Sequence, residues 1–252
     1  MLFIHEVSLK GKRDTNQDRI CVTRSNKEII IGIYDGHGDK GDQVSTYLQE
    51  HFIDGSKKLN QKAELQEYIY NVQNKLKHFK DSGSTLLVMK INIFERKTLT
   101  INLGDCRALI TYDTKPLQLT NDHKVDDQNE RLRLIGKKRN VEYDEEDEIF
   151  RVDGYAISRA MGNTKFSSIS QKAEINFHRF PKNTEYIILG CDGLYDCMTN
   201  KEINKFVSTH KKINSNENKH GKKNVAYLLA KEAIKKGSQD NVSVVIVFFV
   251  SY

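Results

Sequence analysis

Proline is scarce in this chain of 252 residues, and its scarcity limits how the chain can be divided into domains. The two prolines, Pro116 and Pro181, are too few to form a proline-rich linker, and no internal repeat separates one part from another. Hydrophobic residues make up 38% of the chain and charged residues 29%, a balance typical of soluble globular proteins. We therefore predict one domain over residues 1–252, large enough to bury a sizeable core.

Long apolar runs are missing as well. The longest, VSVVIVFFV at residues 242–250, is too short to span a bilayer as a helix and is typical of a buried strand. The amino-terminal stretch MLFIHEVSLKGK contains no long apolar segment like that of a signal peptide. The sequence therefore predicts a protein with no membrane partner.

Cysteine is also infrequent, and no Cys-x-x-Cys pair occurs among Cys21, Cys106, Cys191 and Cys197. Nothing indicates secretion, so we expect reduced thiols and a cytoplasmic and/or nuclear location. The formal charge of +6 would suit an acidic substrate or nucleic acid. The lysines are scattered, however, and no run interleaves them with aromatic residues. A solvated lysine-rich surface is the better interpretation, and we expect no nucleic-acid partner.

Hydrophobic spacing predicts mixed secondary structure. Apolar residues repeat at helical intervals in three segments, which are residues 43–53, 61–79 and 222–236. Residues 82–112 are rich in β-branched side chains broken by polar turns and predict a strand meander, while EYIILGCDG at 185–193 ends another strand. The acidic stretch 142–148 and the Lys/Asn-rich stretch 211–223 predict surface loops. The order of elements indicates hairpins and paired helices, not a regular βαβ alternation.

Aspartates recur where the predicted strands begin or end. The segments IIIGIYDG, LTINLGD and YIILGCDG each end an apolar strand on an aspartate beside a glycine. Two more aspartates stand just before strands, and another follows the third of these segments. The six are Asp18, Asp35, Asp105, Asp192, Asp196 and Asp240.

Such aspartates are the ligands that hard divalent cations require. A carboxylate at the edge of an apolar core is costly unless a cation or hydrogen-bond donors neutralise it. Mg²⁺ and Mn²⁺ prefer carboxylate, carbonyl and water oxygens, and a neighbouring glycine lets the backbone carbonyl turn toward the ion. A single Asp-Gly pair most often only makes a turn. Several of them at strand ends favour a two-metal site, although the sequence alone does not show that they converge.

Eight motifs in order give the chain a resemblance to the type-2C metal-dependent protein phosphatases, the PPM family, over nearly its whole length. They are R-x-x-x-Q-D at 13–18, YDGHG at 34–38, SGST at 82–85, GDCRA at 104–108, LTNDHK at 119–124, VDGYAISRAMGN at 152–163, CDGLYD at 191–196 and QDNVSVVIV at 239–247. Each motif alone is weakly specific, whereas eight in this order make a chance match very improbable.

The resemblance implies an α+β fold, a four-layer α-β-β-α sandwich of two antiparallel sheets flanked by helices, as a single phosphatase catalytic domain over residues 1–252. It also implies two Mg²⁺ or Mn²⁺ ions per chain at one end of the sandwich. By this resemblance Asp35 bridges the two ions and the Gly36 carbonyl binds the second. Asp192 and Asp240 complete the first site.

The remaining site residues follow from the same resemblance. Asp18 would act mostly through metal-bound water, and Asp105 and Asp196 match positions that hold a weaker third ion. Arg13 matches an arginine that grips phosphate, a task suited to the planar guanidinium. His37 matches a general acid for the leaving alkoxide. Alone it would be interpreted as a histidine that caps a turn, but its neighbours in YDGHG favour the catalytic role.

The implied reaction is hydrolysis of phosphoserine and phosphothreonine in phosphoprotein substrates, by a water that two cations activate in a monomeric enzyme. Two alternatives stay open. One is a metal-dependent phosphatase of small phosphoesters, and the other is a non-catalytic relative that binds partners through the same fold. The intact set of Asp35, Asp192, Asp240, Arg13 and His37 argues against the second.

The chain departs from the family pattern at several positions. They are Gln17 for glutamate, Asp39 for the second glycine of GHGG, Val125 for proline, Asn163 for aspartate and Tyr195 for tryptophan. None removes a carboxylate expected to bind metal directly, but Gln17 bears on metal affinity. Residues 164–180 fall where the family has a flap beside the cleft, and we expect this segment to shape substrate choice.

Overall fold

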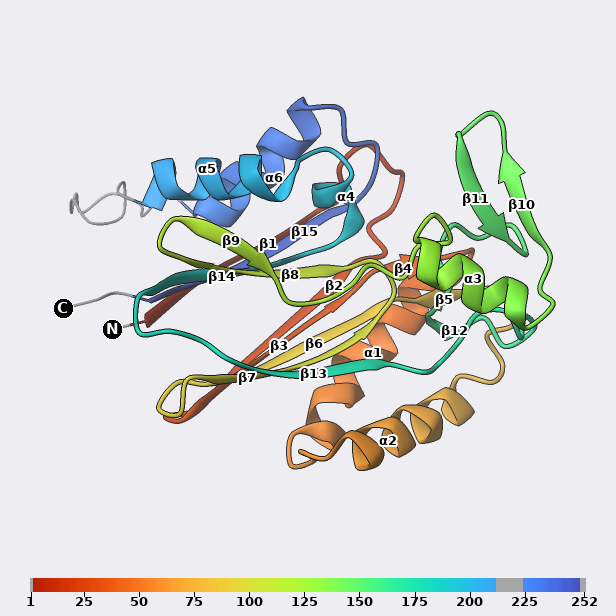
Figure 1. Ribbon diagram of the computed structural model, residues 1–252, viewed down its shortest axis with the longest axis horizontal. Helices are drawn as coiled ribbons and strands as arrows, with labels where there is room; N and C mark the ends of the chain where they lie inside the picture. Colours follow the sequence, from red (N-terminus) through yellow and green to blue (C-terminus); the bar gives the residue numbers. More distant parts are fainter. Residues whose placement is uncertain (1, 212–223, 250–252) are drawn as a thin grey trace.

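The computed structural model describes residues 2–211 and 224–249, and its strands form two five-stranded antiparallel sheets that stack face to face (Figure 1). One sheet has the order β1 (Leu2–Leu9), β15 (Val242–Phe249), β14 (Thr184–Gly190), β8 (Arg107–Tyr112) and β9 (Lys115–Gln118). The other has the order β13 (Glu174–Arg179), β7 (Lys97–Leu103), β6 (Leu86–Asn92), β3 (Glu28–Tyr34) and β2 (Arg19–Arg24).

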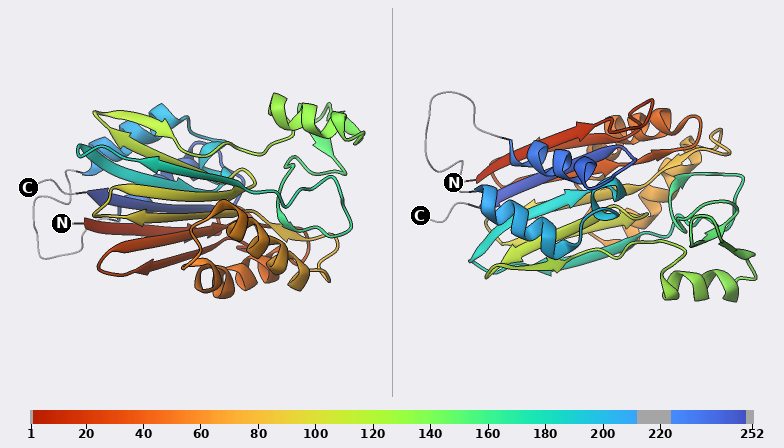
Figure 2. Two further views of the ribbon diagram at one scale, coloured as in Figure 1. Left: turned by 60° about the horizontal axis from the view of Figure 1, so that its bottom comes forward. Right: turned by 90° about the horizontal axis from the view of Figure 1, so that it is seen from above.

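Helices cover the two outer faces of this sandwich. On the β3 sheet lie α1 (Gly41–Ser56) and α2 (Lys62–Lys75), and on the β15 sheet lie α4 (Asp192–Tyr195), α5 (Asn200–His210) and α6 (Val225–Lys235) (Figures 1 and 2). The predicted α-β-β-α sandwich of two antiparallel sheets is therefore confirmed.

The apolar run at residues 29–34 is explained by burial of both faces of β3. Successive side chains of a strand point to opposite faces of its sheet. Ile30 and Tyr34 pack against α1 and α2, whereas Ile29, Ile31 and Ile33 lie in the core between the two sheets. Strand β15 is buried on both faces in the same way, which explains the near-continuous run of valine and isoleucine.

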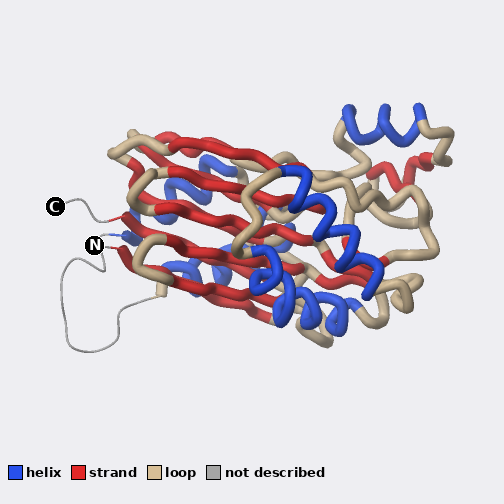
Figure 3. The backbone as a smooth tube through the Cα atoms, turned by 90° about the horizontal axis from the view of Figure 1, so that it is seen from below, coloured by secondary structure: helices blue, strands red, loops and turns tan. Residues whose placement is uncertain are grey.

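A smaller unit projects from the end of the sandwich opposite to the start of β1 (Figures 2 and 3). It contains α3 (Gln128–Gly136) and the hairpin of β10 (Val141–Asp144) and β11 (Ile149–Val152). Its own apolar cluster includes Val125, Leu134 and Val152. We call residues 124–157 the flap. Beside it, β4 (Gly36–His37), β5 (Gly83–Ser84) and β12 (Met161–Gly162) form a short three-stranded sheet.

Two expectations from the sequence are wrong. Residues 142–148 are not a plain loop, because they contain most of β10 and the turn to β11, where Arg151 pairs with Asp144 across the hairpin. The prediction of a flap at residues 164–180 is wrong for Glu174–Arg179, which form the edge strand β13 paired along β7, although Phe166 and Ile169 pack in the apolar cluster of the flap. A pattern within one segment does not reveal a partner that lies elsewhere in the chain.

The predicted helices are present with small differences in their bounds. The segment 43–53 lies within α1, the segment 61–79 is helical only to Lys75, and the segment 222–236 contains α6. The predicted loop at 211–223 lies outside the described residues except for Lys211. Within the described part of the chain, every helix is too short or too polar to cross a membrane.

Candidate metal centre

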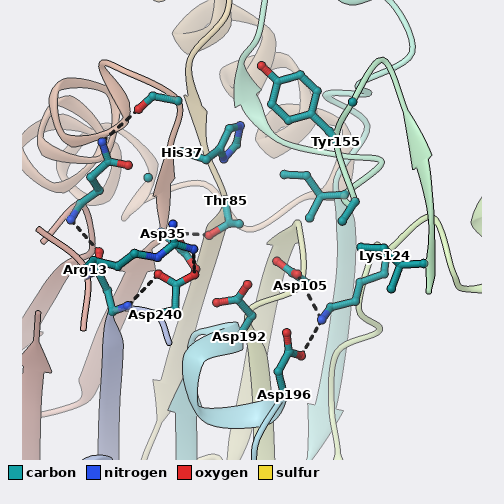
Figure 4. Close-up of a pocket in the computed structure, with 18 of the residues that line it drawn as sticks. Arg13, Asp35, His37, Thr85, Asp105, Lys124, Tyr155, Asp192, Asp196 and Asp240 are labelled. Atoms are coloured by element: carbon teal, nitrogen blue, oxygen red, sulfur yellow. Dashed lines mark hydrogen bonds and ion pairs between the residues drawn. The ribbon is translucent and has the colours of Figure 1, made fainter. Parts of the chain in front are cut away.

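A cleft of about 660 Å³ opens between one end of the sandwich and the flap. Seven residues that the sequence singled out line it, and Figure 4 shows their side chains from opposite sides of the cleft: Arg13, Asp35, His37, Asp105, Asp192, Asp196 and Asp240. The Gly36 backbone lines it as well. Asp18 is the exception. It lies beneath the cleft, 2% exposed, with oxygens close to those of Asp35.

The strand ends explain why these residues meet. Strand β3 ends at Tyr34, so the next residue, Asp35, emerges at the end of the sheet. Its backbone N–H donates to Thr85 Oγ1 at 3.0 Å, and its carbonyl accepts from the Thr85 N–H at 2.8 Å. Strand β14 likewise ends at Gly190, and Asp192 opens the short helix α4. The carboxylates are therefore held on a rigid scaffold.

The cleft carboxylates are electrostatically unfavourable without a counter-charge. Burial raises the pKa of Asp192 to about 8, of Asp18 to about 7 and of Asp105 to about 6. For Asp35 the same cause, followed by repulsion from neighbouring aspartates, raises the pKa well above its ordinary value. Because these aspartates hold protons tightly, a divalent cation that replaces the protons would stabilise the site strongly.

The donor set fits hard divalent cations. Both oxygens of Asp18 and Oδ1 of Asp192 are buried with no hydrogen-bond partner among the described residues. The Ser243 hydroxyl and the Cys191 thiol lie near Asp18 and offset only part of its burial. Unpartnered carboxylate oxygens at and beneath a cleft that Gly36 also lines are the oxygen-rich surroundings that Mg²⁺ and Mn²⁺ prefer. The metal roles assigned to individual residues stay a prediction.

Arg13 stands at the rim of the cleft. Its Nη2 donates to Asp240 Oδ2 at 2.6 Å, and its side chain is 59% exposed. A guanidinium has five N–H donors in a fixed plane, so this pairing orients the group and leaves other donors for an incoming anion.

His37 is positioned by residues that the sequence did not assign to the site. Its Nε2 lies 2.8 Å from Asn163 Oδ1, and the Tyr155 ring packs edge-on against it at 5.6 Å. A Cβ at Gly83 would lie 1.9 Å from Asn163 Oδ1, 2.7 Å from His37 Nε2 and 2.5 Å from the backbone carbonyl oxygen of Met161, so only glycine fits there. Burial lowers the pKa of His37, and the bond to Asn163 opposes this more weakly.

Thr85, Lys124 and Tyr155 are further residues of the cleft that the sequence did not assign. Each lies in one of the eight motifs, so the motifs were the feature of the sequence that could have identified them as site residues. Lys124 lies between two of the predicted metal ligands, with its Nζ 2.5 Å from Asp196 Oδ1 and 3.7 Å from Asp105 Oδ2.

Gln17, where the chain departs from the family pattern, also lines the cleft. Its Nε2 donates to the Gly38 carbonyl at 3.0 Å, and its backbone N–H donates to Asn241 Oδ1 at 2.8 Å. Its side chain thus holds the loop that follows His37.

The flap forms the far wall of the cleft, through residues 149–157 and not through the predicted 164–180. Its base is fixed by Glu130, which is 5% exposed. The Glu130 carboxylate accepts from Arg133 Nη2 at 2.8 Å, from Arg159 Nε at 3.0 Å and from Ser158 Oγ at 2.5 Å. Burial would raise the pKa of Glu130, but these donors outweigh it and hold that pKa well below its usual range.

Known proteins resemble this chain along nearly its full length. The family model described as "Protein phosphatase 2C" matches residues 6–242. "Probable protein phosphatase 2C 17" of Arabidopsis thaliana is 28% identical over 257 residues, which cover 96% of this chain and 87% of that protein. "Protein phosphatase 1A" of Bos taurus is 29% identical and covers 87% of this chain, but only 62% of its own length is matched.

Solved structures show the same fold. A C. elegans sex determining protein superposes with a TM-score of 0.85 at 22% identity, covering 98% of this chain and 64% of that one. A phosphatase from Toxoplasma gondii superposes with a TM-score of 0.83 at 20% identity, covering 99% of this chain and 96% of that one.

Together with the acidic cleft, these matches define the class of protein as a protein serine/threonine phosphatase, for which the family implies dependence on divalent metal. The chain belongs to the protein phosphatase 2C family, as the eight motifs predicted.

Proposed function

We propose that this chain hydrolyses phosphoserine and phosphothreonine in proteins with two Mg²⁺ or Mn²⁺ ions bound in the cleft, and with a third ion held more weakly. The observation that carries the proposal is the group of cleft carboxylates with raised pKa values and unpartnered oxygens. Asp35, the Gly36 carbonyl, Asp192 and Asp240 would hold the two ions. Asp18 would assist from beneath through water.

The bound cations would supply an activated water and neutralise phosphate charge. The chain's own residues would supply the rest. Arg13, oriented by Asp240, would bind phosphate oxygens with its remaining N–H groups. Asn163 Oδ1 accepts from His37 Nε2, so the Nε2 proton is held and Nδ1 is the nitrogen that exchanges a proton. A protonated His37 would donate from Nδ1, directly or through water, to the leaving serine or threonine oxygen.

Two further features belong to the proposal. We propose that the enzyme is a monomer. Cys21, Cys106, Cys191 and Cys197 are free thiols, which supports a cytoplasmic and/or nuclear location.

A metal-dependence assay tests the proposal. The purified chain is dialysed against EDTA and assayed with p-nitrophenyl phosphate and with a panel of phosphoserine and phosphothreonine peptides, before and after addition of Mn²⁺. We expect activity only with metal, and higher kcat/KM on peptides than on small phosphoesters. Full activity in EDTA would overturn the two-metal mechanism. A preference for small phosphoesters would favour the small-substrate alternative, and inactivity under all conditions the non-catalytic one.

The proton-donor role of His37 is tested with His37→Gln. General acids contribute ~10²–10⁴-fold, so the variant should lose about that factor on phosphoserine peptides. On p-nitrophenyl phosphate the loss should be much smaller, because nitrophenolate leaves without needing a proton. His51→Gln, at a half-exposed position on α1, is the matched control and should leave both rates unchanged. Equal losses of His37→Gln on both substrates would assign His37 a structural role.

A further inference from the structure

The third-ion position already holds a positive charge that belongs to the chain. The Lys124 ammonium lies 2.5 Å from Asp196 Oδ1 and 3.7 Å from Asp105 Oδ2, and Figure 4 shows it reaching from the flap side of the cleft to both carboxylates. Asp105 is 4% exposed, whereas the Asp196 side chain is 54% exposed. The lysine therefore joins a buried carboxylate to an exposed one at the mouth of the cleft.

The backbone around Lys124 is fixed, so this placement does not depend on the lysine side chain alone. The His123 N–H donates to the Gly104 carbonyl at 3.0 Å, and His123 Nδ1 accepts from the Gly104 N–H at 3.1 Å. The Val125 N–H donates to the Ala156 carbonyl at 2.7 Å. Lys124 is thus held between the turn that carries Asp105 and the rest of the flap.

The residue before His123 adds a second attachment on the same side. Asp122 accepts from Arg107 Nε at 3.0 Å, and the Arg107 guanidinium lies 4.5 Å from the centre of the Tyr195 ring, next to Asp196. The LTNDHK segment therefore connects the turn of Asp105, the helix that ends before Asp196 and the flap. Its lysine is directed at the space between the two carboxylates.

The charge and the position of Lys124 both oppose the binding of a third cation. Two carboxylates carry a charge of −2, which a divalent cation balances, but the ammonium has already offset one unit. Oxygen ligands of Mg²⁺ or Ca²⁺ stand about 2.0–2.6 Å from the ion, close to the distance at which Lys124 Nζ contacts Asp196. The ammonium and a cation therefore compete for the same oxygens.

We propose that Lys124 competes with the third cation, and that this cation binds between Asp105 and Asp196 only after the Lys124 ammonium has moved away from them. The proposal rests on the two-cation function above and names a positioning residue for it. It makes the third site weak, because both of its carboxylates face Lys124. Of the residues proposed to hold the first two ions, Asp240 is paired with Arg13, whereas Asp35 and Asp192 contact no lysine or arginine within the described residues, so we expect those two ions to bind first. Occupancy of the third site then reports the free cation concentration after the first two ions are bound.

Direct counting of bound Mn²⁺ tests the proposal without reliance on activity. Free Mn²⁺ is measured by its EPR signal while the wild-type chain and Lys124→Gln are titrated. Both proteins should bind two ions with similar affinity. The third ion should bind Lys124→Gln at least ~10-fold more tightly, because in wild type it must first displace the ammonium from two carboxylates, and even in bulk water two unit-charge pairs about 4 Å apart together exceed the free energy of a tenfold change.

Three variants give the measurement its controls. Lys124→Arg keeps the charge and should keep the weak third site. Lys165→Gln removes a lysine that pairs with Asp81 outside this group and should leave all three affinities unchanged. Adding Asp196→Asn to Lys124→Gln should abolish the gain, which places the third ion at Asp196.

The outcomes separate this proposal from the proposed function. A third-site affinity in Lys124→Gln within twofold of wild type would overturn the competition, while failure of every protein to bind two ions would overturn the two-cation function instead. If Lys124→Gln does not fold, an NMR measurement on the wild-type chain tests the proposal instead. With ¹³C-labelled lysine, the Lys124 ε-CH₂ signal, assigned by its absence in Lys124→Arg, should shift over the Mg²⁺ range of the third ion. If the chemical shift of this signal did not change while the third ion bound, the proposal would be overturned.

Discussion

Glu130, at the base of the flap, and Asp18, beneath the cleft, are both buried carboxylates, at 5% and 2% exposed, but their surroundings differ. Glu130 accepts hydrogen bonds from two arginines and a serine, and its pKa is held well below the usual range. Both oxygens of Asp18 lack a hydrogen-bond partner among the described residues, and burial raises its pKa to about 7.

The comparison distinguishes two uses of a buried acid. A carboxylate whose charge the chain neutralises with its own guanidinium groups holds parts of the fold together. A carboxylate left without donors costs stability unless something from outside binds it, and such groups cluster where proteins carry out chemistry. Asp35 and Asp192 share the second setting, and the Asp105–Asp196 pair, with Lys124 between them, lies between the two extremes.

The largest expected effect comes from removing one cleft carboxylate. Asp192→Asn should lower Mn²⁺-dependent hydrolysis of p-nitrophenyl phosphate by more than the ~10–100-fold typical of residues one shell further from a metal. In EDTA the same variant should melt at a higher temperature than wild type, because folding then no longer buries a carboxyl group whose ionisation the fold opposes. Asp39→Asn, at an exposed position two residues after His37, is the control for both measurements. If Asp192→Asn melted at a lower temperature than wild type in EDTA, Asp192 would stabilise the fold as Glu130 does, and the contrast between the two acids would be wrong.

Glu130→Gln should have the opposite effect on stability. Removing one partner of a buried ion pair typically costs about 3–5 kcal/mol, because the remaining charges stay buried and unpaired. Hydrogen exchange of the α3 amides should therefore be much faster in this variant, while Mn²⁺ affinity at the first two sites is kept. Glu146→Gln, in the exposed turn between β10 and β11, is the matched control. Unchanged protection of α3 would show that Glu130 does not anchor the flap.

The pH dependence of stability should also differ between the two groups. Asp192 and Asp18 have pKa values of about 8 and 7 in the fold, against 3.8 for an aspartate in an unfolded chain, so the metal-free fold binds more protons than the unfolded chain. Its stability should therefore fall as pH rises from about 4 to 8. Glu130, with a lowered pKa, contributes stability that is present above about pH 4.5 and is lost only on further acidification.

Thermal melts between pH 4 and 8, in EDTA and in excess Mn²⁺, check this expectation. The decline should appear in EDTA and be weaker in Asp192→Asn. Saturating Mn²⁺ should remove it, because the cations then replace the protons. The same decline with and without Mn²⁺ would mean that groups other than the cleft aspartates cause it.

The smallest expected effect concerns Gln17, which lines the cleft without a charge. A charge acting through water contributes on the order of 1 kcal/mol, which corresponds to a several-fold change in affinity. Gln17→Glu should therefore lower the Mn²⁺ concentration for half-maximal activity several-fold, with little change in turnover at saturating metal. A metal titration at fixed pH and ionic strength measures it, with Gln43→Glu on the exposed face of α1 as control. An unchanged or higher metal requirement would show that Gln17 does not act on the second ion.

Much of the site was predictable from the sequence because its residues follow strands. Alternating or continuous apolar runs show where a strand ends, and the residue after the end is known without a structure. Asp35 and Asp192 could be assigned in this way, and ordered motifs added Arg13, His37 and Asp240. The sandwich of two sheets followed from the same family resemblance and is confirmed.

Only the tertiary structure decided which charges meet. It brings Glu130 to Arg159 across the base of the flap, seats Lys124 between Asp105 and Asp196, and places the cleft wall at 149–157 and not at 164–180. Local sequence determines secondary structure through side-chain periodicity and turn chemistry, which act over a few residues. An ion pair depends on the positions of two groups that are far apart in the chain, and packing of the core sets those positions.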